Sequence, residues 1–328
     1  MSNNHSPTSP ELLDAARALR QNIDSWIIRT PVLRTVALED ELDGDCRVSA
    51  KLEFLQQTGT FKARGALANI ARLSADERGA GVTAVSAGNH AIAVAYAAKV
   101  FGVDAKVVML ASASRLRVEK CRAYGAEVVL ADDVHAAFQA AEQIRESEGR
   151  SFIHPFEGEG VTLGTATLGI EICEQIPGFD ILLIPVGGGG LCSGIALAAK
   201  QLNPSATVIG VEPEGADTMY RSFVAGEPQS IDRVDTIADS LGAPYAMPYS
   251  FAVCRDNVDE IVRVSDAALR SAMRFLFRRQ KIAVEPACAA TTAALLGPVR
   301  SLAEDKHVAL VMCGSNVDWS TYVEYAEL

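Results

Sequence analysis

The sequence predicts an α/β protein whose sheets are mainly parallel. Short apolar runs rich in β-branched residues alternate with stretches of helical length, and several runs end in loops of small residues. The chain has 328 residues, of which 49% are hydrophobic and 22% charged. This is enough for a large buried core, and the length favours two domains over one.

The first predicted element is a helix near residues 10–24, where Pro10 and Glu11 suit the first turn. Five strand-to-helix pairs follow it. The predicted strands cover residues 82–86, 105–110, 126–131, 181–186 and 207–212, and the helices after them cover 89–102, 114–125, 134–149, 191–202 and 216–226. This βαβα order is typical of parallel sheets with helices on both faces.

Composition excludes several classes of partner. Forty-one acidic residues against thirty basic ones give a net charge of -11, which disfavours binding to nucleic acid. The beginning of the chain does not resemble a signal peptide. Residues 181–199 lack charge over about the length of a membrane span, but Pro185 and four glycines interrupt them. We expect strand, loop and helix there, and no membrane partner.

The seven cysteines form no CxxC pair and no His/Cys cluster. Neither a disulfide framework nor a metal site is therefore predicted, and a reducing, cytoplasmic location fits best.

Three loops at predicted strand ends could hold an anionic ligand. The first contains Thr58, Gly59 and Thr60, after which Lys62 falls in the first turn of a predicted helix. A lysine is disfavoured there by the helix dipole, so Lys62 is a candidate nucleophile, with a solvated helix lysine as the alternative. A buried amine with a lowered pKa would act as nucleophile and base.

The second loop, Ser86 to His90, joins a predicted strand to an alanine-rich helix. Its small residues would let a ligand approach the backbone, and Ser86 and Asn89 offer hydrogen-bonding groups. An ordinary capped helix start is the alternative, with His90 as a satisfied helix residue.

The third loop is the run Gly187–Gly190, whose unobstructed N–H groups would form a cradle for a phosphate. The run is not a dinucleotide fingerprint, because Cys192 and Ser193 occupy the positions where a third glycine would stand. Ile195 and Ala196 likewise replace the Lys and Ser/Thr of a Walker loop. The loop therefore predicts a phosphorylated cofactor of another kind.

Four motifs occur in a telling order: Thr-Gly-Thr-Phe-Lys-Ala-Arg-Gly-Ala (58–66), Ser-Ala-Gly-Asn-His (86–90), Gly-Gly-Gly-Gly-Leu (187–191) and Cys-Gly-Ser-Asn (313–316). Together they resemble the fold-type II pyridoxal-phosphate (PLP) enzymes, and within them the threonine/serine dehydratase (serine racemase-like) family, over residues 30–318. The resemblance implies a tryptophan synthase β-like fold of two three-layer α/β domains. The large PLP-binding domain would span residues 1–80 and 158–328, with a small inserted domain at 81–157. It also implies a homodimer.

The resemblance assigns the site residues. Lys62 would carry the cofactor as a Schiff base and serve as catalytic base. The other cofactor-binding residues would be Phe61, Asn89, Gly187, Gly188, Gly189, Gly190, Leu191, Glu285 and Cys313. The residues around the substrate carboxylate would be Thr60, Ser86, Ala87, Asn89 and His90.

The reaction implied is removal of water and then ammonia from a small β-hydroxy L-amino acid such as threonine or serine, giving a 2-oxo acid. A thiol at position 313 stabilises a protonated pyridine less than a carboxylate would, which favours elimination. Ala87 argues against a racemase, because racemases of this group resemble Ser-Ser-Gly-Asn-His and alanine cannot transfer a proton.

Some positions depart from the family pattern. Ser240 stands where relatives usually carry glycine, and Leu163 where threonine dehydratases usually carry glutamine. These departures leave 3-hydroxyaspartate and phenylserine open as substrates. Glu212 and Ala216 match a cation site of some relatives, but Thr218 replaces its carboxylate, so no metal is predicted.

Two alternatives from other classes stay open at this point. One is a nicotinamide-dependent dehydrogenase, in which Glu212 would bind ribose. The other is a non-catalytic ligand-binding protein of the same fold, against which the intact Lys62 argues. For Glu285, an ordinary helix start is an equally good interpretation.

Overall fold

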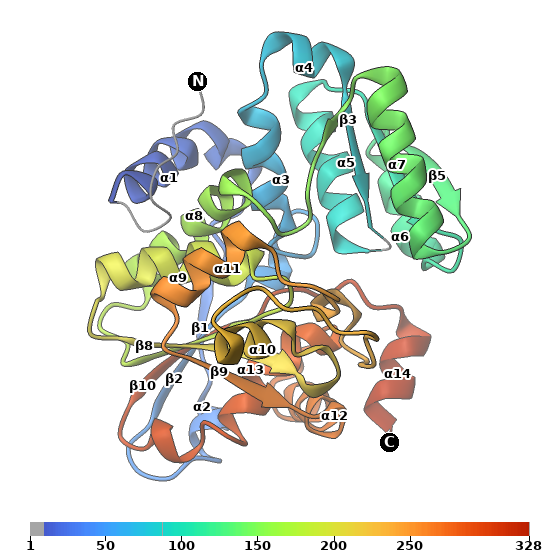
Figure 1. Cartoon of the computed structure of the whole chain (residues 1–328). Helices are drawn as coiled ribbons and strands as arrows, with labels where there is room; N and C mark the ends of the chain where they lie inside the picture. Colours follow the sequence, from blue (N-terminus) through green and yellow to red (C-terminus); the bar gives the residue numbers. More distant parts are fainter. Residues whose placement is uncertain (1–9, 87, 328) are drawn as a thin grey trace.

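The computed structural model describes residues 10–86 and 88–327, which form two α/β domains with mainly parallel sheets (Figure 1). The large domain contains a six-stranded sheet of order β1-β2-β10-β7-β8-β9. The small domain contains a four-stranded sheet of order β5-β4-β3-β6. The predicted fold class is confirmed.

The large sheet is parallel except for its edge strand β1, which pairs antiparallel with β2. Its central strands are buried on both faces, as expected for a sheet covered by helices. The strands are β1 (Val32–Arg34), β2 (Arg47–Lys51), β7 (Ile181–Pro185), β8 (Thr207–Pro213), β9 (Glu260–Val264) and β10 (His307–Val311).

Helices cover both faces of this sheet. The helices that lie outside residues 81–157 are α1 (Pro10–Ile23), α2 (Val36–Glu39), α3 (Lys62–Ala71), α4 (Ala75–Ala80), α8 (Glu159–Gln175), α9 (Gly190–Leu202), α10 (Thr218–Ala225), α11 (Pro248–Asn257), α12 (Asp266–Phe275), α13 (Pro286–Leu295) and α14 (Trp319–Glu327). Short 3₁₀ turns occur at Asp24–Trp26, Glu53–Leu55, Glu214–Ala216, Asp239–Leu241 and Ser301–Ala303, and a π turn at Leu276–Gln280.

Helix α8 lies between α3 and α9 and is buried on all sides over most of its length. Glycines make these close crossings possible. A Cβ at Gly164 would lie 2.5 Å from the carbonyl oxygen of Arg64, and a Cβ at Gly169 would lie 2.7 Å from the Cβ of Ala198. The helix that carries Lys62 is thereby packed tightly against the core.

The small sheet consists of β3 (Val82–Val85), β4 (Ala105–Leu110), β5 (Glu127–Ala131) and β6 (Ser151–Phe152), all parallel. Its helices are α5 (Asn89–Phe101), α6 (Arg115–Ala123) and α7 (Val134–Glu148). Helix α5 packs against α3 of the large domain, and α7 covers the opposite face of the sheet (Figure 1).

The helix predicted near residues 10–24 and the five predicted strand-to-helix pairs are all present, with ends shifted by at most two residues. The uncharged stretch 181–199 is strand β7, the glycine loop and most of α9, as predicted. Among the described residues, no helix is long and apolar enough to cross a membrane.

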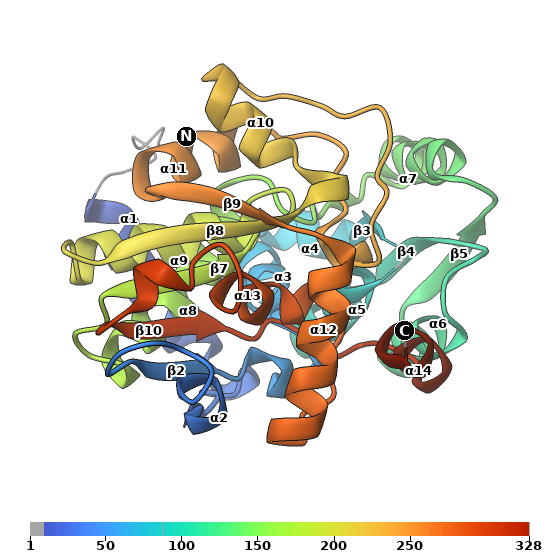
Figure 2. The same cartoon turned by 90° about the horizontal axis from the view of Figure 1, so that it is seen from below.

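Strands β2, β10 and β7 are neighbours in the sheet (Figure 2). They run parallel, so the loops that follow their carboxyl ends meet at one edge of the sheet. These loops carry Lys62, Cys313 and the four glycines, respectively.

Candidate cofactor and active site

The loop before Lys62 and the loop before α14 are joined by backbone contacts. Thr60 forms a β-bridge with Gly314, and the Phe61 N–H donates to the carbonyl of Cys313 at 3.1 Å. The Lys62 N–H donates to Thr60 Oγ1 at 3.3 Å. Lys62 therefore begins α3 beside Cys313, although the two residues lie far apart in the sequence.

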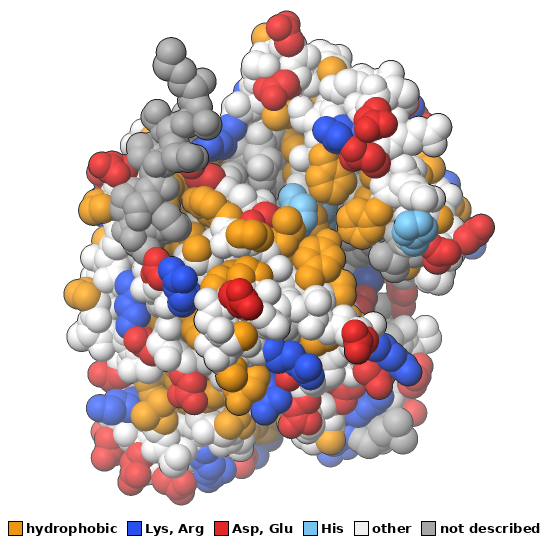
Figure 3. All heavy atoms as spheres, in the orientation of Figure 1, with side chains coloured by type: hydrophobic (Ala, Val, Ile, Leu, Met, Phe, Trp, Pro, Cys, Tyr) orange, Lys and Arg blue, Asp and Glu red, His pale blue; other side chains and the backbone are white. Residues whose placement is uncertain are grey.

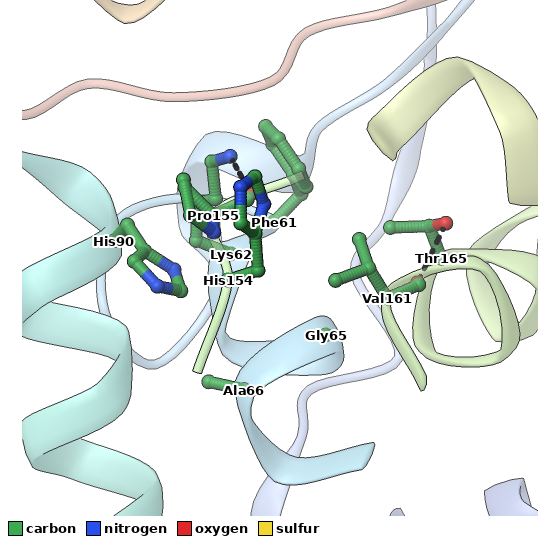
Figure 4. A pocket seen from close by; sticks show the side chains of 9 residues that line it. All are labelled: Phe61, Lys62, Gly65, Ala66, His90, His154, Pro155, Val161 and Thr165. Carbon is green, nitrogen blue, oxygen red and sulfur yellow. Dashed lines mark hydrogen bonds between the residues drawn. The ribbon is translucent and has the colours of Figure 1, made fainter. Parts of the chain in front are cut away.

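The Lys62 amine points into a small pocket between α3, α5 and α8 (Figure 4). Its Nζ donates to the carbonyl of Pro155 at 2.6 Å and lies 5.1 Å from the centre of the Phe61 ring. Burial lowers the pKa of Lys62 to about 8, against a weaker opposing effect of Cys313 and Glu285. A substantial neutral fraction near neutral pH is what a nucleophilic lysine needs.

Two neutral histidines share this pocket. Burial, and then the nearby charge of Lys62, lower the pKa of His90 to about 3 and that of His154 to about 4. His90 Nε2 lies 2.8 Å from the carbonyl of Ile153, so this nitrogen carries the proton and donates. His154 Nδ1 accepts from the backbone N–H of Glu157 at 2.9 Å. No spacing of residues around His154 indicated that it belongs to this pocket.

The glycine loop has the form of an anion cradle. The backbone N–H groups of Gly187–Leu191 lie at the start of α9. They donate no hydrogen bond to any residue that the structure describes. A Cβ at Gly188 would lie 2.4 Å from the Phe156 ring, and Gly189 has a φ of +88°. Free N–H donors at a helix start, with no room for a side chain at Gly188, fit the phosphate of pyridoxal phosphate.

Asn89, at the start of α5, is held by a buried carboxylate. Its Nδ2 donates to Glu285 Oε1 at 2.9 Å and also lies 3.1 Å from Ser240 Oγ. Glu285 precedes α13 but its side chain does not cap that helix. The carboxylate accepts from Asn89 and from the Asn316 backbone N–H at 3.1 Å instead, which argues against an ordinary helix start. The sequence assigned Asn316 no role.

Cys313 is buried directly after β10, and its thiol contacts that of Cys288 on α13. This contact and burial raise the pKa of Cys313, so it carries a neutral thiol. Nothing in the sequence pairs these two cysteines, because the sheet and α13 bring them together.

The residues predicted around the substrate carboxylate are placed as follows. Thr60 is fully buried, and Ser86 Oγ accepts from the Gly88 N–H at 3.1 Å. Asn89 and His90 are buried in the first turn of α5. Ala87 lies outside the described residues.

Both oxygens of the Glu212 carboxylate accept hydrogen bonds from the backbone of α10. They accept from the N–H groups of Met219 at 2.9 Å and Tyr220 at 2.7 Å, in the first turn of α10. Burial raises the pKa of Glu212 to about 8. Thr218 donates to the carbonyl of Ala243. Glu212 is thus unsuited to binding ribose, and the described residues contain no group of three metal ligands.

Comparison with known proteins identifies the family. A sequence profile described as "Pyridoxal-phosphate dependent enzyme" matches residues 23–314. The chain is 50% identical to a phenylserine dehydratase of Ralstonia pickettii over 98% of both chains. It is 37% identical to an L-threonine ammonia-lyase of Thermotoga maritima, covering 93% of this chain and 76% of that one.

The fold agrees with these sequence comparisons. The structure of maize serine racemase superimposes with a TM-score of 0.90, at 33% identity over 95% of both chains. The resemblance inferred from the four motifs is confirmed, as are the predicted cofactor and the predicted class of PLP-dependent lyase. The chain belongs to the pyridoxal-phosphate dependent enzymes of fold type II.

Proposed function

We propose that this enzyme is an ammonia-lyase for β-hydroxy amino acids that carry an aromatic β-substituent, of the phenylserine type. The observation that carries the proposal is the 50% identity to phenylserine dehydratase, which extends over 98% of both chains. The identity to the threonine ammonia-lyase is much lower, at 37%.

An aromatic cluster beside Lys62 supports an aryl substrate. The Phe156 ring packs edge-on against His154 with centres 4.7 Å apart, and lies 6.0 Å from the ring of Tyr245. Phe156 follows Pro155, whose carbonyl accepts from the Lys62 amine. Apolar side chains gather where the two domains meet (Figure 3). An aryl group near these rings would gain edge-to-face contacts.

The proposed roles follow the geometry. Pyridoxal phosphate supplies an electron sink for charge that develops at the substrate Cα. Lys62 would hold the cofactor and, with its lowered pKa, take the Cα proton. The N–H groups of Gly187–Leu191 would bind the phosphate, and Cys313 would lie at the pyridine nitrogen.

Asn89 would donate to the cofactor's 3'-oxygen, with Glu285 holding its amide group and Phe61 beside the ring. Thr60, Ser86, His90 and the backbone at Ala87 would surround the substrate carboxylate, together with Asn89. This set is proposed on the resemblance and on the distances given above.

We also propose the domain limits 1–80 with 158–328, and 81–157, because the small sheet begins at Val82 and ends at Phe152. A homodimer is proposed by analogy with the family, and light scattering would test it. A cytoplasmic location is supported by the seven cysteines, all free in the structure.

The decisive experiment compares L-threo-phenylserine, threonine, serine and 3-hydroxyaspartate as substrates, with release of 2-oxo acid and ammonia as the readout. We expect kcat/KM for phenylserine to exceed that for threonine by about tenfold or more. No D-enantiomer should form, because Ala87 has no transferable proton. A preference for any of the other three substrates would refute the proposal.

The aromatic cluster is tested by Tyr245→Ala. We expect a larger loss of kcat/KM for phenylserine than for serine, because only phenylserine contacts the ring. Tyr325→Ala is the matched control, since Tyr325 packs against Arg270 and is not among the residues that line the Lys62 pocket. Equal losses for both substrates would show that Tyr245 does not contact the aryl group.

A further inference from the structure

Asn316 occupies the point where the two domains and the Lys62 loop meet. Its side chain is 5% exposed. The Nδ2 group donates to the carbonyl of Thr58 at 2.9 Å and to Asn89 Oδ1 at 2.8 Å. The Oδ1 atom accepts from Lys120 Nζ at 2.7 Å. Both ends of the amide therefore have partners, one from the large domain and two from the small domain.

Helix α6 supplies a second contact to the same residue. The Arg117 guanidinium donates to the Asn316 carbonyl at 2.9 Å and forms an ion pair of 2.7 Å with Asp239. Helix α6 lies beside α14, which follows Asn316 (Figures 1 and 2). The cations of α6 thus tie the small domain to two loops of the large domain.

These contacts fix the direction of the Asn316 amide. A lysine ammonium only donates, so the atom that faces Lys120 must be the amide oxygen. The Thr58 carbonyl only accepts, so the atom that faces it must be the amide nitrogen. The same nitrogen then meets Asn89, whose oxygen has to face it.

The orientation of Asn89 follows from that of Asn316. With Oδ1 turned towards Asn316, Asn89 presents its Nδ2 group to Glu285 and Ser240. Gly59 allows Asn316 this position, because a Cβ at Gly59 would lie 2.7 Å from Asn316 Oδ1. The φ of Gly59, +79°, also favours glycine.

We propose that Asn316 is a positioning residue that couples the docking of α6 onto the large domain to the orientation of the Asn89 amide. When α6 is docked, Lys120 holds the Asn316 oxygen, and Asn89 is turned to donate. When α6 moves away, Asn316 loses its charged partner and Asn89 loses its fixed direction. The inference rests on the proposed placement of Asn89 against the cofactor.

Two substitutions separate the hydrogen bond of Asn316 with Asn89 from its hydrogen bond with Lys120. Asn316→Asp keeps an acceptor for Lys120 but cannot donate to Asn89. Lys120→Met removes the contact of the Asn316 side chain with α6, although Arg117 can still donate to the Asn316 carbonyl, and it leaves the Asn316–Asn89 hydrogen bond possible. The controls are Asn257→Asp, at a buried asparagine of 6% exposure on α11, and Lys99→Met, on the exposed side of α5.

The readouts are hydrogen exchange of residues 115–123 in the apoenzyme and the pH midpoint of the bound cofactor's absorption in the holoenzyme. For Asn316→Asp we expect unchanged exchange and a shift of the midpoint by about one pH unit. For Lys120→Met we expect exchange faster by about tenfold and a smaller midpoint shift in the same direction. The double variant should shift the midpoint no further than Asn316→Asp alone.

A Lys120→Met enzyme with faster exchange but an unchanged midpoint would overturn the coupling. So would an unchanged midpoint in Asn316→Asp. Asn89→Ala tests the underlying placement separately, because an unchanged midpoint in that variant means that Asn89 does not contact the cofactor. None of these readouts depends on which amino acid is the substrate.

Discussion

Lys62 and Arg64 are two buried cations on the same helix, and their surroundings differ sharply. The Lys62 amine donates to the neutral carbonyl of Pro155, and burial lowers its pKa to about 8. The Arg64 guanidinium is fully buried but forms ion pairs with Glu53 and Glu171, which raise its pKa.

The comparison shows that burial alone does not decide whether a cation keeps its proton. Two carboxylates hold the charge of Arg64, whereas none of the described residues that line the Lys62 pocket is a carboxylate. Lys51 extends the ion network, because its Nζ donates to Glu171 at 2.7 Å. The network anchors α3 to β2 and α8, and so fixes the backbone from which Lys62 projects.

The largest effect on activity is expected when the Lys62 amine is removed. Lys62→Ala should abolish both 2-oxo acid release and the attachment of cofactor by borohydride, because no other amine is held in the pocket. Mass spectrometry of the reduced protein checks the attachment. Cofactor fixed elsewhere, or activity that survives, would contradict the assignment of Lys62.

The paired cation should matter for stability. Arg64→Met leaves Glu53 without its ion-pair partner and Glu171 with Lys51 alone, and we expect a loss of about 3–5 kcal/mol in the free energy of unfolding. Urea denaturation measures the loss. The control is Arg115→Met, which breaks an exposed pair with Glu119 and should cost less than about 1 kcal/mol. Equal losses of unfolding free energy in both variants would show that the buried ion network stabilises the protein no more than an exposed ion pair does.

The lowered pKa of Lys62 predicts how cofactor capture depends on pH. Only the neutral amine attacks an aldehyde, and its fraction grows as the proton is lost with rising pH. The capture rate of the apoenzyme should therefore rise about tenfold per pH unit below pH 8 and then level off. Stopped-flow absorbance measures it. A rise that continues towards 10.5, the ordinary value for lysine, would show that the pocket does not desolvate the amine.

The smallest effect concerns the rim of the ion network. Thr167 Oγ1 accepts from Arg64 Nη1 at 3.1 Å, so Thr167→Val should cost about 0.5–1.5 kcal/mol. In an Arg64→Met background the same change should cost almost nothing, because the donor is already gone. A full cost in both backgrounds would assign the effect of Thr167 to packing.

Local sequence features predicted much of the fold and part of the site. The strand-to-helix pairs were visible because short apolar runs alternate with stretches of helical length, and several of these runs end in loops of small residues. Helices α8 and α13 were not predicted, because both are buried around nearly their whole circumference and show no polar face. Strand β2 was not among the five predicted strands, although the loop before Lys62 was placed at a strand end.

In the site, too, local sequence features indicate some residues and miss others. Lys62 and the glycine loop stand out because their unusual chemistry is local. The roles of Asn316, His154 and Cys288 arise from contacts with residues distant in the sequence, as with Asn316 and Asn89. The local sequence around an asparagine or a histidine does not indicate which distant residue it will contact in the folded protein.

The position of β10 has a consequence for biosynthesis. This strand lies between β2 and β7 in the sheet, although it is translated after every other strand that the structure describes. During translation the early strands must leave a gap in the sheet until β10 emerges from the ribosome. Vitamin B6 can therefore be loaded productively only after β10 has been translated, which places cofactor binding after the synthesis of both domains.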